Sequence, residues 1–496
     1  MNPLKKLASQ TAIYGLSSIL GRLLNYLLVP LYTRVFTPEE YGIVTEMYAY
    51  VSFLIIILTY GMETAFFRFS QSQTNKENVY STTLISILFT SALFIIIINI
   101  YAKPIASVIG YETKSVYINW FAWIIGLDAI SAIPFAKLRE QKKAKTFAAL
   151  RLINIFVNIF FNLFFIVYLP QVINNSNHFL YHIAHKLYDS QMREGYVFVS
   201  NLIASAFTLL LLAPSVLKIN WHFDVQLWKN MLRYALPLLI AGLAGMTNET
   251  MDRILIKYLL PKDISMVQLG IYGACYKVSI LMTIFTQAFR FAAEPFFFAQ
   301  EKESGSAQLY ADVMKYFTMA GMIIFLAIML FIEIVQQFIG EQYREGIGVV
   351  PILLLANVFF GMFFNLSIWY KLSGKTRYGA ALSLFGAALT ILLNILLIPL
   401  MGYMGAAWAT LICYFSMLVA SYIIGQKKYY IPYDVGRIAL IILTAIAIYF
   451  ISDLLKNVLS QALKYVFNTF LLILYLVLLF FLERLKKRNL ATSETK

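Results

Sequence analysis

The chain has 496 residues, of which 60% are hydrophobic and 13% are charged, and its formal net charge is +15. Soluble domains carry about 25% charged residues, so this composition excludes a soluble globule and indicates a membrane protein. The positive charge concentrates in the segments that we predict to be cytoplasmic. This distribution follows the positive-inside rule and does not indicate a nucleic-acid-binding surface. It predicts that both termini are cytoplasmic.

Apolar runs long enough to cross a bilayer of about 30 Å recur along the whole chain, and we predict an all-α protein with about fourteen transmembrane helices. A β-barrel is excluded because its strands would alternate in roughly ten-residue segments. The first run lacks a small-residue cleavage site, so we expect it to remain as a helix rather than to be a signal peptide. The predicted spans are 9–35, 42–67, 79–102, 115–137, 147–169, 195–216, 231–259, 268–298, 312–336, 347–370, 378–400, 404–425, 434–452 and 463–483.

The second half of the chain repeats features of the first half. We predict an N-terminal lobe over residues 1–220, a C-terminal lobe over 221–430, and a final helix pair with a cytoplasmic tail over 431–496. Basic loops on the same side of both halves make the repeat parallel, which is typical of transporters with two lobes around a central site. The matched positions are Asn25 with Asn248, Arg34 with Lys257, Gly42 with Gly270, and Asn162 with Asn394.

The first predicted helix has an arginine, Arg22, near its middle. A guanidinium at mid-bilayer depth costs roughly 2.5–3.5 kcal/mol on insertion scales, so we expect Arg22 to face a partner or a water-filled cavity. Helical spacing places Ser18 and Asn25 on the same side, which makes a polar stripe. No acid stands three or four residues from Arg22, although Asp128 of another helix could satisfy it. We therefore predict that Arg22 and Asn25 line a cavity.

The seventh predicted helix and the one after it carry further charges, which have two interpretations. Glu249 with Arg253, and Arg290 with Glu294, stand four residues apart and could simply form ion pairs within a helix. Alternatively, the cations line a substrate cavity, and Glu249 and Asp252 couple transport to an ion. The cavity candidates in this half are Asn248, Arg253, Lys277 and Arg290.

The remaining polar residues have simpler interpretations. The asparagines at 154, 158 and 162 recur at helical spacing and predict interhelical hydrogen bonds. His178, His182 and His185 would share a face of a short helix in the longest outer loop, but no carboxylate or cysteine stands at ligand spacing. We therefore favour solvated histidines over a metal site. Cys275 and Cys413 fall inside predicted spans and suggest packing rather than a disulfide.

The sequence contains no glycine-rich phosphate loop of the GxxxxGK[ST] type. We therefore expect no ATP-driven motor in this chain. No nucleophile and base can be argued together either, and we expect a protein that is not an enzyme and that uses no cofactor.

Three segments carry a resemblance to a known family. They are PLYTRVFTPEEYGIV, the fourth-helix ending IPFAKLR with the basic loop that follows it, and YGAALSLFGAALTILLNILLIPLMGYMGAAWATLICY. Together they resemble the bacterial polysaccharide-biosynthesis flippases, which are the O-antigen and lipid-linked oligosaccharide translocases of the multidrug/oligosaccharidyl-lipid/polysaccharide exporter superfamily. The resemblance covers about residues 5–430.

This resemblance implies movement of an undecaprenyl-diphosphate-linked oligosaccharide from the inner to the outer leaflet of the bacterial cytoplasmic membrane, by alternating access. The implied partners are the lipid-linked glycan, membrane lipids and polysaccharide polymerase machinery. The related lipid II flippases hold the diphosphate with arginines of the first and seventh helices, which here correspond broadly to Arg22 and Arg253. The planar donor fork of a guanidinium suits a phosphate.

Three other functions remain open. A cation-coupled multidrug antiporter of the same fold would be expected to have acids on the first and seventh helices. Arg22 argues against it, whereas Glu249 and Asp252 leave room for it. A lipid II flippase is the second alternative. A membrane glycan polymerase or ligase is the third, and the small outer loops disfavour it.

Overall fold

The computed structural model describes residues 20–21, 23–72, 75–300, 305–456 and 458–494, and every regular element in these residues is helical. Eleven of the described helices are long and apolar enough to cross a membrane, and a pair bent by 51° would add a twelfth. The prediction of an all-α polytopic membrane protein is therefore confirmed. The count of fourteen is not confirmed, because the first predicted span lies mostly outside the described residues and the helix over 225–259 is not among the eleven.

The described chain divides into two compact units, one ending at Gly273 and the other beginning at Ala274. By its contacts, the seventh predicted helix therefore belongs with the first unit. The predicted lobes, 1–220, 221–430 and 431–496, were defined by the internal repeat and by helix order, and they stay a prediction.

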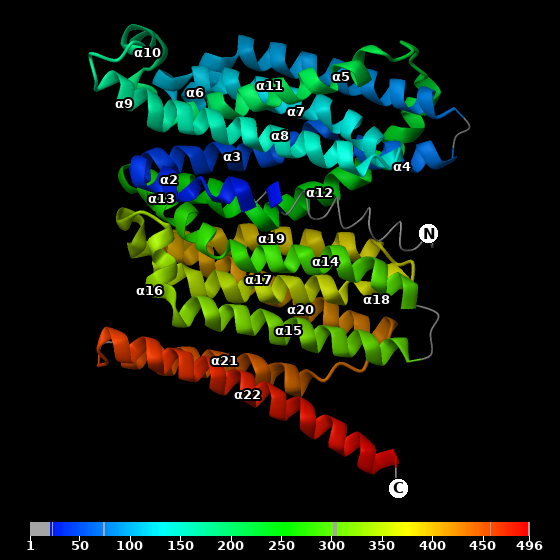
Figure 1. The fold of residues 1–496 in the computed structure, drawn as a ribbon. Coiled ribbons are helices and arrows are strands. Elements are labelled where there is room, and N and C mark those ends of the chain that lie inside the picture. Colours follow the sequence, from blue (N-terminus) through cyan, green and yellow to red (C-terminus); the bar gives the residue numbers. More distant parts are fainter. Residues whose placement is uncertain (1–19, 22, 73–74, 301–304, 457, 495–496) are drawn as a thin grey trace. The chain divides into compact units, whose positions relative to one another are not determined.

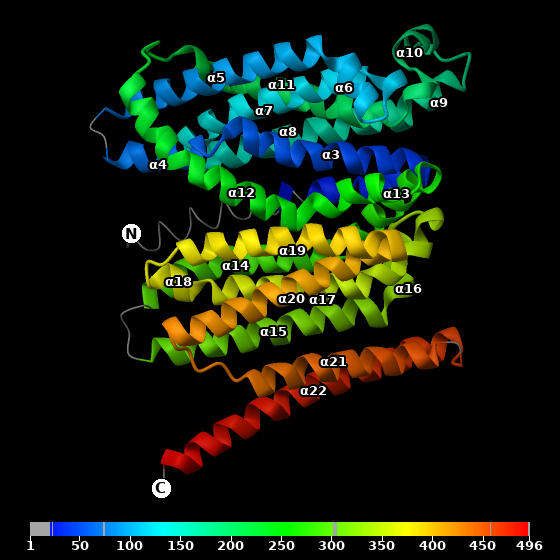
Figure 2. The same cartoon turned by 180° about the vertical axis from the view of Figure 1, so that it is seen from behind.

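The first unit is a helical bundle in which α5, α7, α8 and α11 run side by side, as Figures 1 and 2 show from opposite sides. Helix α3 packs against both α7 and α12. The elements are α2 Val29–Val35, α3 Pro38–Thr59, α4 Met62–Ser72, α5 Lys76–Ile100, α6 Ala102–Val108, η1 Glu112–Lys114, α7 Val116–Glu140, α8 Ala144–Leu163, the π-helical turn η2 Phe164–Tyr168, α9 Leu169–Ile173, α10 Tyr181–Leu187, η3 Ser190–Met192, α11 Gly195–Leu217, α12 Val225–Leu259 and α13 Lys262–Val278, whose last turn lies in the second unit.

In the second unit, α20 packs against both α17 and α19, and α21 and α22 pack against α15 (Figure 2). Its elements are α14 Ile280–Gln300, α15 Ser306–Leu330, α16 Ile332–Val335, η4 Gln336–Phe338, η5 Glu341–Gly348, α17 Val349–Leu366, α18 Ile368–Leu372, α19 Arg377–Met401, α20 Tyr403–Lys428, α21 Val435–Leu455 and α22 Gln461–Glu494.

Local sequence sets both ends of α3. At its start, Thr37 accepts a hydrogen bond from the backbone N–H of Glu40, and the Glu40 carboxylate accepts one from the Thr37 N–H, which is a capping box. At its end, Tyr60 and Gly61 have positive φ values of 31° and 74° and break the span before α4. A Cβ atom on Gly61 would lie 2.8 Å from the Ala235 carbonyl oxygen, so this glycine permits both the turn and the approach of α12.

Helices α3 and α13 cross at Gly42 and Gly270, the two glycines that the sequence matches as equivalent. A Cβ atom on Gly270 would collide with the backbone of Pro38, and one on Gly42 would collide with the backbone of Met266. The helices therefore meet backbone to backbone, as small residues allow within membranes. Contact between equivalent residues is what a two-fold repeat of either orientation produces at its axis, and the parallel orientation stays a prediction.

Candidate functional site

A cavity of about 370 Å³ opens inside the first unit between α4, α7, α8 and the beginning of the described chain. Its volume falls in the range of small-molecule sites, roughly 300–1,000 Å³. We call it the arginine cavity, and the lining residues that matter below are Gly21, Asn25, Glu63, Phe135, Arg139, Phe147, Arg151 and Asn154.

Arg139 forms one wall of the arginine cavity from the last turn of α7. It makes an ion pair with Glu63 of α4. Its guanidinium carbon also lies 4.8 Å from the centre of the Phe67 ring and 5.9 Å from that of Phe147. A cation over an aromatic face is stabilised by the ring quadrupole, more so when water is excluded. Arg139 therefore ties α7 to α4 at this wall of the cavity.

Arg151 enters the same cavity from α8 and is exposed there. Its guanidinium carbon lies 4.2 Å from the centre of the Phe135 ring and 5.7 Å from that of Phe147. The carboxylate of Asp128, on α7, attracts it electrostatically. Among the described residues, however, Arg151 makes no direct ion pair or hydrogen bond. Its guanidinium N–H donors are thus available to an incoming acceptor.

Asn154 of α8 lines the cavity, and the three asparagines of this helix join it to neighbouring helices. Asn154 donates a hydrogen bond of 2.8 Å to Thr208 of α11, and Asn158 donates one of 3.4 Å to Asn25. Asn162 accepts a 2.7 Å bond from a tyrosine hydroxyl of α2. These bonds confirm the predicted interhelical role of the asparagine ladder. They also place Asn25 of the predicted polar stripe at the cavity.

The arrangement is suited to an anion that accepts hydrogen bonds. Arg139 is neutralised by Glu63, whereas the charge of Arg151 is balanced only at a distance by Asp128. A phosphate or carboxylate could bind the Arg151 guanidinium in a bidentate way, which gives both orientation and strength. The described residues contain no group of three side chains that could hold a metal ion.

Some of the predicted polar residues of α12 are buried between helices of the first unit, and others are exposed. Asp252 is 2% exposed and accepts a 2.5 Å hydrogen bond from the Tyr272 hydroxyl. Arg253 lies 3.4 Å from the Asp252 carboxylate and donates a 2.6 Å bond to the backbone carbonyl of Glu249. Arg253 thus pairs with the Asp252 carboxylate, and the Glu249 side chain is exposed. Asn248 is buried at 5% exposure.

The other predicted cavity residues are distributed differently. Arg22 lies outside the described residues, although Gly21 and Asn25 on either side of it line the arginine cavity. In the second unit, Lys277 is half-buried in the last turn of α13. Arg290 is exposed on α14 with its guanidinium 4.5 Å from the centre of the Phe364 ring. Their roles in substrate binding stay a prediction.

Sequence analysis missed the two arginines that define the cavity. Arg151 lies inside the predicted span 147–169, so the cost of burying its charge was an available signal, although a weaker one than for Arg22 because Arg151 is near the end of its span. Arg139 ends the segment IPFAKLR, and nothing in its local sequence shows that α4 brings Glu63 and the Phe67 ring beside it.

The three loop histidines follow the C-terminal end of the span that contains α8, at the end opposite to the arginine cavity. His182 and His185 are on α10, and His178 precedes it. The His185 ring packs edge-on against Tyr181 with 4.6 Å between ring centres, and His178 accepts a 3.2 Å hydrogen bond from the backbone N–H of Leu180. These contacts give the histidines local packing roles in the loop.

Comparison with known proteins places this architecture in a family. A family model described as polysaccharide biosynthesis protein matches residues 7–299, which is more than half of the chain. No curated protein matches the chain in sequence.

Solved structures resemble the chain in fold. The lipid II flippase MurJ in an inward closed conformation has a TM-score of 0.72 at 15% identity, covering 95% of this chain and 98% of that one. An inward-facing multidrug resistance MATE family transporter of the MOP superfamily has a TM-score of 0.64 at 14% identity, covering 84% and 94%. An outward-facing MATE family transporter has 0.56 at 14% identity, covering 84% and 95%. The fold is thus shared with flippases and with drug transporters.

Proposed function

Because the chain belongs to the polysaccharide biosynthesis protein family, we propose that it is a flippase for a lipid-linked oligosaccharide. The proposed substrate is an undecaprenyl-diphosphate glycan, such as an O-antigen unit, moved from the inner to the outer leaflet of the bacterial cytoplasmic membrane. Membrane lipids surround the protein, and polysaccharide polymerase machinery takes the product. The fold shared with the lipid II flippase MurJ supports this class of substrate.

The observation that carries the proposal is the exposed guanidinium of Arg151 in the arginine cavity, which makes no ion pair or hydrogen bond with the described part of the chain. A diphosphate needs cationic donors in a site of lowered dielectric, and arginine offers them in a planar fork. The cavity lies near the turn between α7 and α8, which carries the basic loop predicted to be cytoplasmic. It is therefore at the end where a substrate made in the cytoplasm would enter.

We further propose that Arg22, Asn25, Asn248, Arg253, Lys277 and Arg290 contact the diphosphate or line its route during alternating access. Glu249 and Asp252 are the proposed positions for ion coupling. Asp252 is the better supported of the two, because its side chain is buried whereas that of Glu249 is exposed. Outward movement of a negative charge gains about 2.3 kcal/mol per 100 mV of membrane potential, so the electrical gradient assists the diphosphate.

The test is a flipping assay in proteoliposomes with a fluorescent lipid-diphosphate oligosaccharide and a membrane-impermeant quencher. Hydrogen bonds to charged groups are worth about 1.5–3 kcal/mol, so Arg151→Gln should slow flipping by roughly tenfold or more. Arg151→Lys should retain part of the rate. Arg377→Gln removes an exposed arginine at the start of α19 and is the matched control. Normal flipping by Arg151→Gln would reject the arginine cavity as the binding site.

A cation-coupled multidrug antiporter is the second candidate, favoured by the MATE-like fold and by the buried Asp252. In the same vesicles, efflux of a cationic dye driven by a proton or sodium gradient, abolished in Asp252→Asn and accompanied by no lipid flipping, would select this function instead. A lipid II flippase would be recognised by transport of lipid II in preference to the oligosaccharide lipid.

A further inference from the structure

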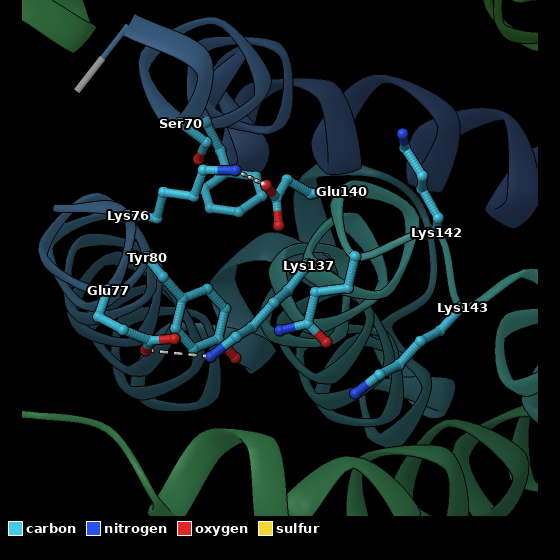
Figure 3. Close-up of a pocket in the computed structure, with 10 residues that line it drawn as sticks. Ser70, Lys76, Glu77, Tyr80, Lys137, Glu140, Lys142 and Lys143 are labelled. Atoms are coloured by element: carbon cyan, nitrogen blue, oxygen red, sulfur yellow. Dashed lines mark hydrogen bonds and ion pairs between the residues drawn. The ribbon is translucent and has the colours of Figure 1, made fainter. Parts of the chain in front are cut away.

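A second pocket of about 430 Å³ lies at the same end of the first unit, between α4, α5 and the turn that joins α7 to α8 (Figure 3). We call it the lysine pocket. Four lysines and only two glutamates line it, so its charge is positive: Lys76, Lys137, Lys142, Lys143, Glu77 and Glu140.

Two of the four lysines are held by the two glutamates. The Lys76 ammonium lies 2.6 Å from the Glu140 carboxylate, and that of Lys137 lies 3.2 Å from Glu77, as the dashed lines in Figure 3 show. Lys137 also lies 3.8 Å from the centre of the Tyr80 ring. These pairs join α5 to α7 and build two sides of the pocket.

The other two lysines come from the turn that ends α7. The Lys143 N–H bonds to the Leu138 carbonyl at 2.9 Å and the Lys142 N–H bonds to that of Arg139 at 3.0 Å, which is a Schellman motif. The motif needs a left-handed residue, and Lys142 occupies that position at φ 58°. Both side chains are exposed and make no ion pair within the described chain. Two uncompensated ammonium groups therefore stand beside the pocket.

Ser70 provides an independent sign that the pocket has an occupant. This α4 residue lines the pocket at 1% exposure, and its hydroxyl has no hydrogen-bond partner among the described residues. Buried polar groups are normally satisfied, and an unmet one calls for an explanation. An oxygen atom of a bound anion would supply the missing partner, and the lysines would supply its counter-charge.

We propose that the lysine pocket binds a phosphate-bearing anion, the same chemistry being offered by the headgroup of an acidic membrane lipid and by free phosphate. The pocket lies at the ends of the spans α5 and α7, the depth at which lipid headgroups are found. Lysines near an anionic leaflet attract such headgroups. The site is separate from the arginine cavity, and its occupancy does not depend on transport.

The test uses the purified full-length protein and three probes. Native mass spectrometry measures binding of dihexanoylphosphatidylglycerol, which is anionic, and of dihexanoylphosphatidylcholine, which is zwitterionic. Equilibrium dialysis measures binding of radiolabelled inorganic phosphate. We expect saturable binding of phosphatidylglycerol, at least tenfold tighter than that of phosphatidylcholine. Saturable binding of inorganic phosphate that competes with phosphatidylglycerol would support the proposal with free phosphate as a second source.

The variants remove the two uncompensated charges. Lys142→Gln with Lys143→Gln should weaken binding tenfold or more, whereas Lys427→Gln with Lys428→Gln, an adjacent exposed pair at the end of α20, should leave it unchanged. Ser70→Ala should weaken binding severalfold. Lys142→Gly distinguishes a loss of binding from a loss of folding. Glycine adopts the left-handed conformation of this turn without strain, so the thermal midpoint should not fall. Binding of phosphatidylglycerol should nevertheless weaken, because the ammonium group is gone. Equal affinity for both lipids, or binding unaffected by the Lys142 and Lys143 changes, would overturn the proposal.

Discussion

At the scale of single residues, Glu46 of α3 shows how this protein buries charge. It has no exposed surface, and its carboxylate accepts hydrogen bonds from the Lys257 ammonium at 2.7 and 3.0 Å, from the Tyr50 hydroxyl at 2.7 Å and from the Tyr111 hydroxyl. Lys257 also donates a 2.5 Å bond to the carbonyl of Ile109. The pair therefore joins α3 to α12 with both charges satisfied.

We predict that Lys257→Met destabilises the protein strongly, because it leaves the Glu46 carboxylate buried without its counter-charge. Breaking a buried pair from one side costs about 3–5 kcal/mol, whereas removing both charges together is often nearly neutral. The double variant Glu46→Gln with Lys257→Met should therefore be more stable than Lys257→Met alone. Thermal midpoints of the purified proteins in the same detergent measure this order.

Lys456→Ala is the matched control for that comparison. Lys456 pairs with Asp453 at 2.7 Å, but both side chains are more than two-fifths exposed. Exposed pairs contribute at most about 1 kcal/mol, so the midpoint should change little. A double variant at Glu46 and Lys257 that is less stable than the lysine single variant would show that the pair is not the source of the effect.

Residue-level prediction worked where periodicity carried the information. The asparagine ladder follows helical spacing, and the structure shows its predicted interhelical bonds. It failed where a partner comes from a distant helix. Nothing near Glu46 in sequence indicates Lys257, and nothing near Arg139 indicates Glu63. Such pairs depend on tertiary crossings, which hydropathy and spacing do not define.

At the scale of helices, the crossing of α3 and α13 depends on having no side chain at Gly270. We predict that Gly270→Ala separates the two helices and lowers the thermal midpoint markedly, since its Cβ would collide with the Pro38 backbone. Gly245→Ala is the control, because nothing lies within 4 Å of its Cβ position on α12. Alanine there should be neutral or stabilising, by up to about 1 kcal/mol. Equal midpoints for the two variants would contradict a tight crossing.

The start of α12 provides a pH-dependent prediction. Asp224 caps this helix by accepting a 2.9 Å hydrogen bond from the Leu227 backbone N–H, and this bond is the main cause that lowers the pKa of the Asp224 carboxyl. The carboxyl thus has a lower pKa in the folded protein than in the unfolded chain, where its pKa is about 3.9. Its ionisation therefore stabilises the fold fully above the unfolded-state pKa, and this stabilisation is lost as the pH falls through the folded-state pKa. Asparagine also caps helices but does not titrate.

We therefore expect wild type and Asp224→Asn to differ most in stability near neutral pH, with wild type the more stable. The difference should shrink between about pH 5 and pH 2, as the Asp224 carboxylate takes up a proton. Thermal midpoints measured across this range test the expectation. Parallel curves for the two proteins would show that the cap does not depend on the charge of Asp224.

Helix positions were predicted far better than helix breaks. The expected spans 195–216 and 378–400 correspond to α11 and α19 within a residue or so at each end. Burial of about twenty apolar residues is a strong signal that needs no tertiary information. In contrast, the expected span 268–298 is divided into α13 and α14 with a 51° bend at Ser279, and the span 42–67 is broken at Tyr60 and Gly61. A window long enough to detect a membrane span averages over a break of one or two residues.

At the scale of the whole molecule, orientation follows from one continuous span. Residues Ala144–Ile173 form a 30-residue apolar helix, so its two flanking loops must lie on opposite sides of the membrane. The loop before it and its flanks contain five basic residues, Lys137, Arg139, Lys142, Lys143 and Lys145, whereas the loop after it contains two, Lys186 and Arg193. The positive-inside rule therefore predicts that the first loop is cytoplasmic and that the second is outside.

We predict that Asn175→Cys reacts with a membrane-impermeant maleimide in intact cells, whereas Lys143→Cys reacts only in inverted membrane vesicles. Both positions are exposed, so reaction depends on the side of the membrane rather than on burial. The native protein is its own blank, because Cys275 and Cys413 have no exposed surface and should remain unlabelled. If Lys143→Cys were labelled in intact cells and Asn175→Cys were protected, the predicted orientation would be wrong. The proposed direction of transport would then be wrong as well.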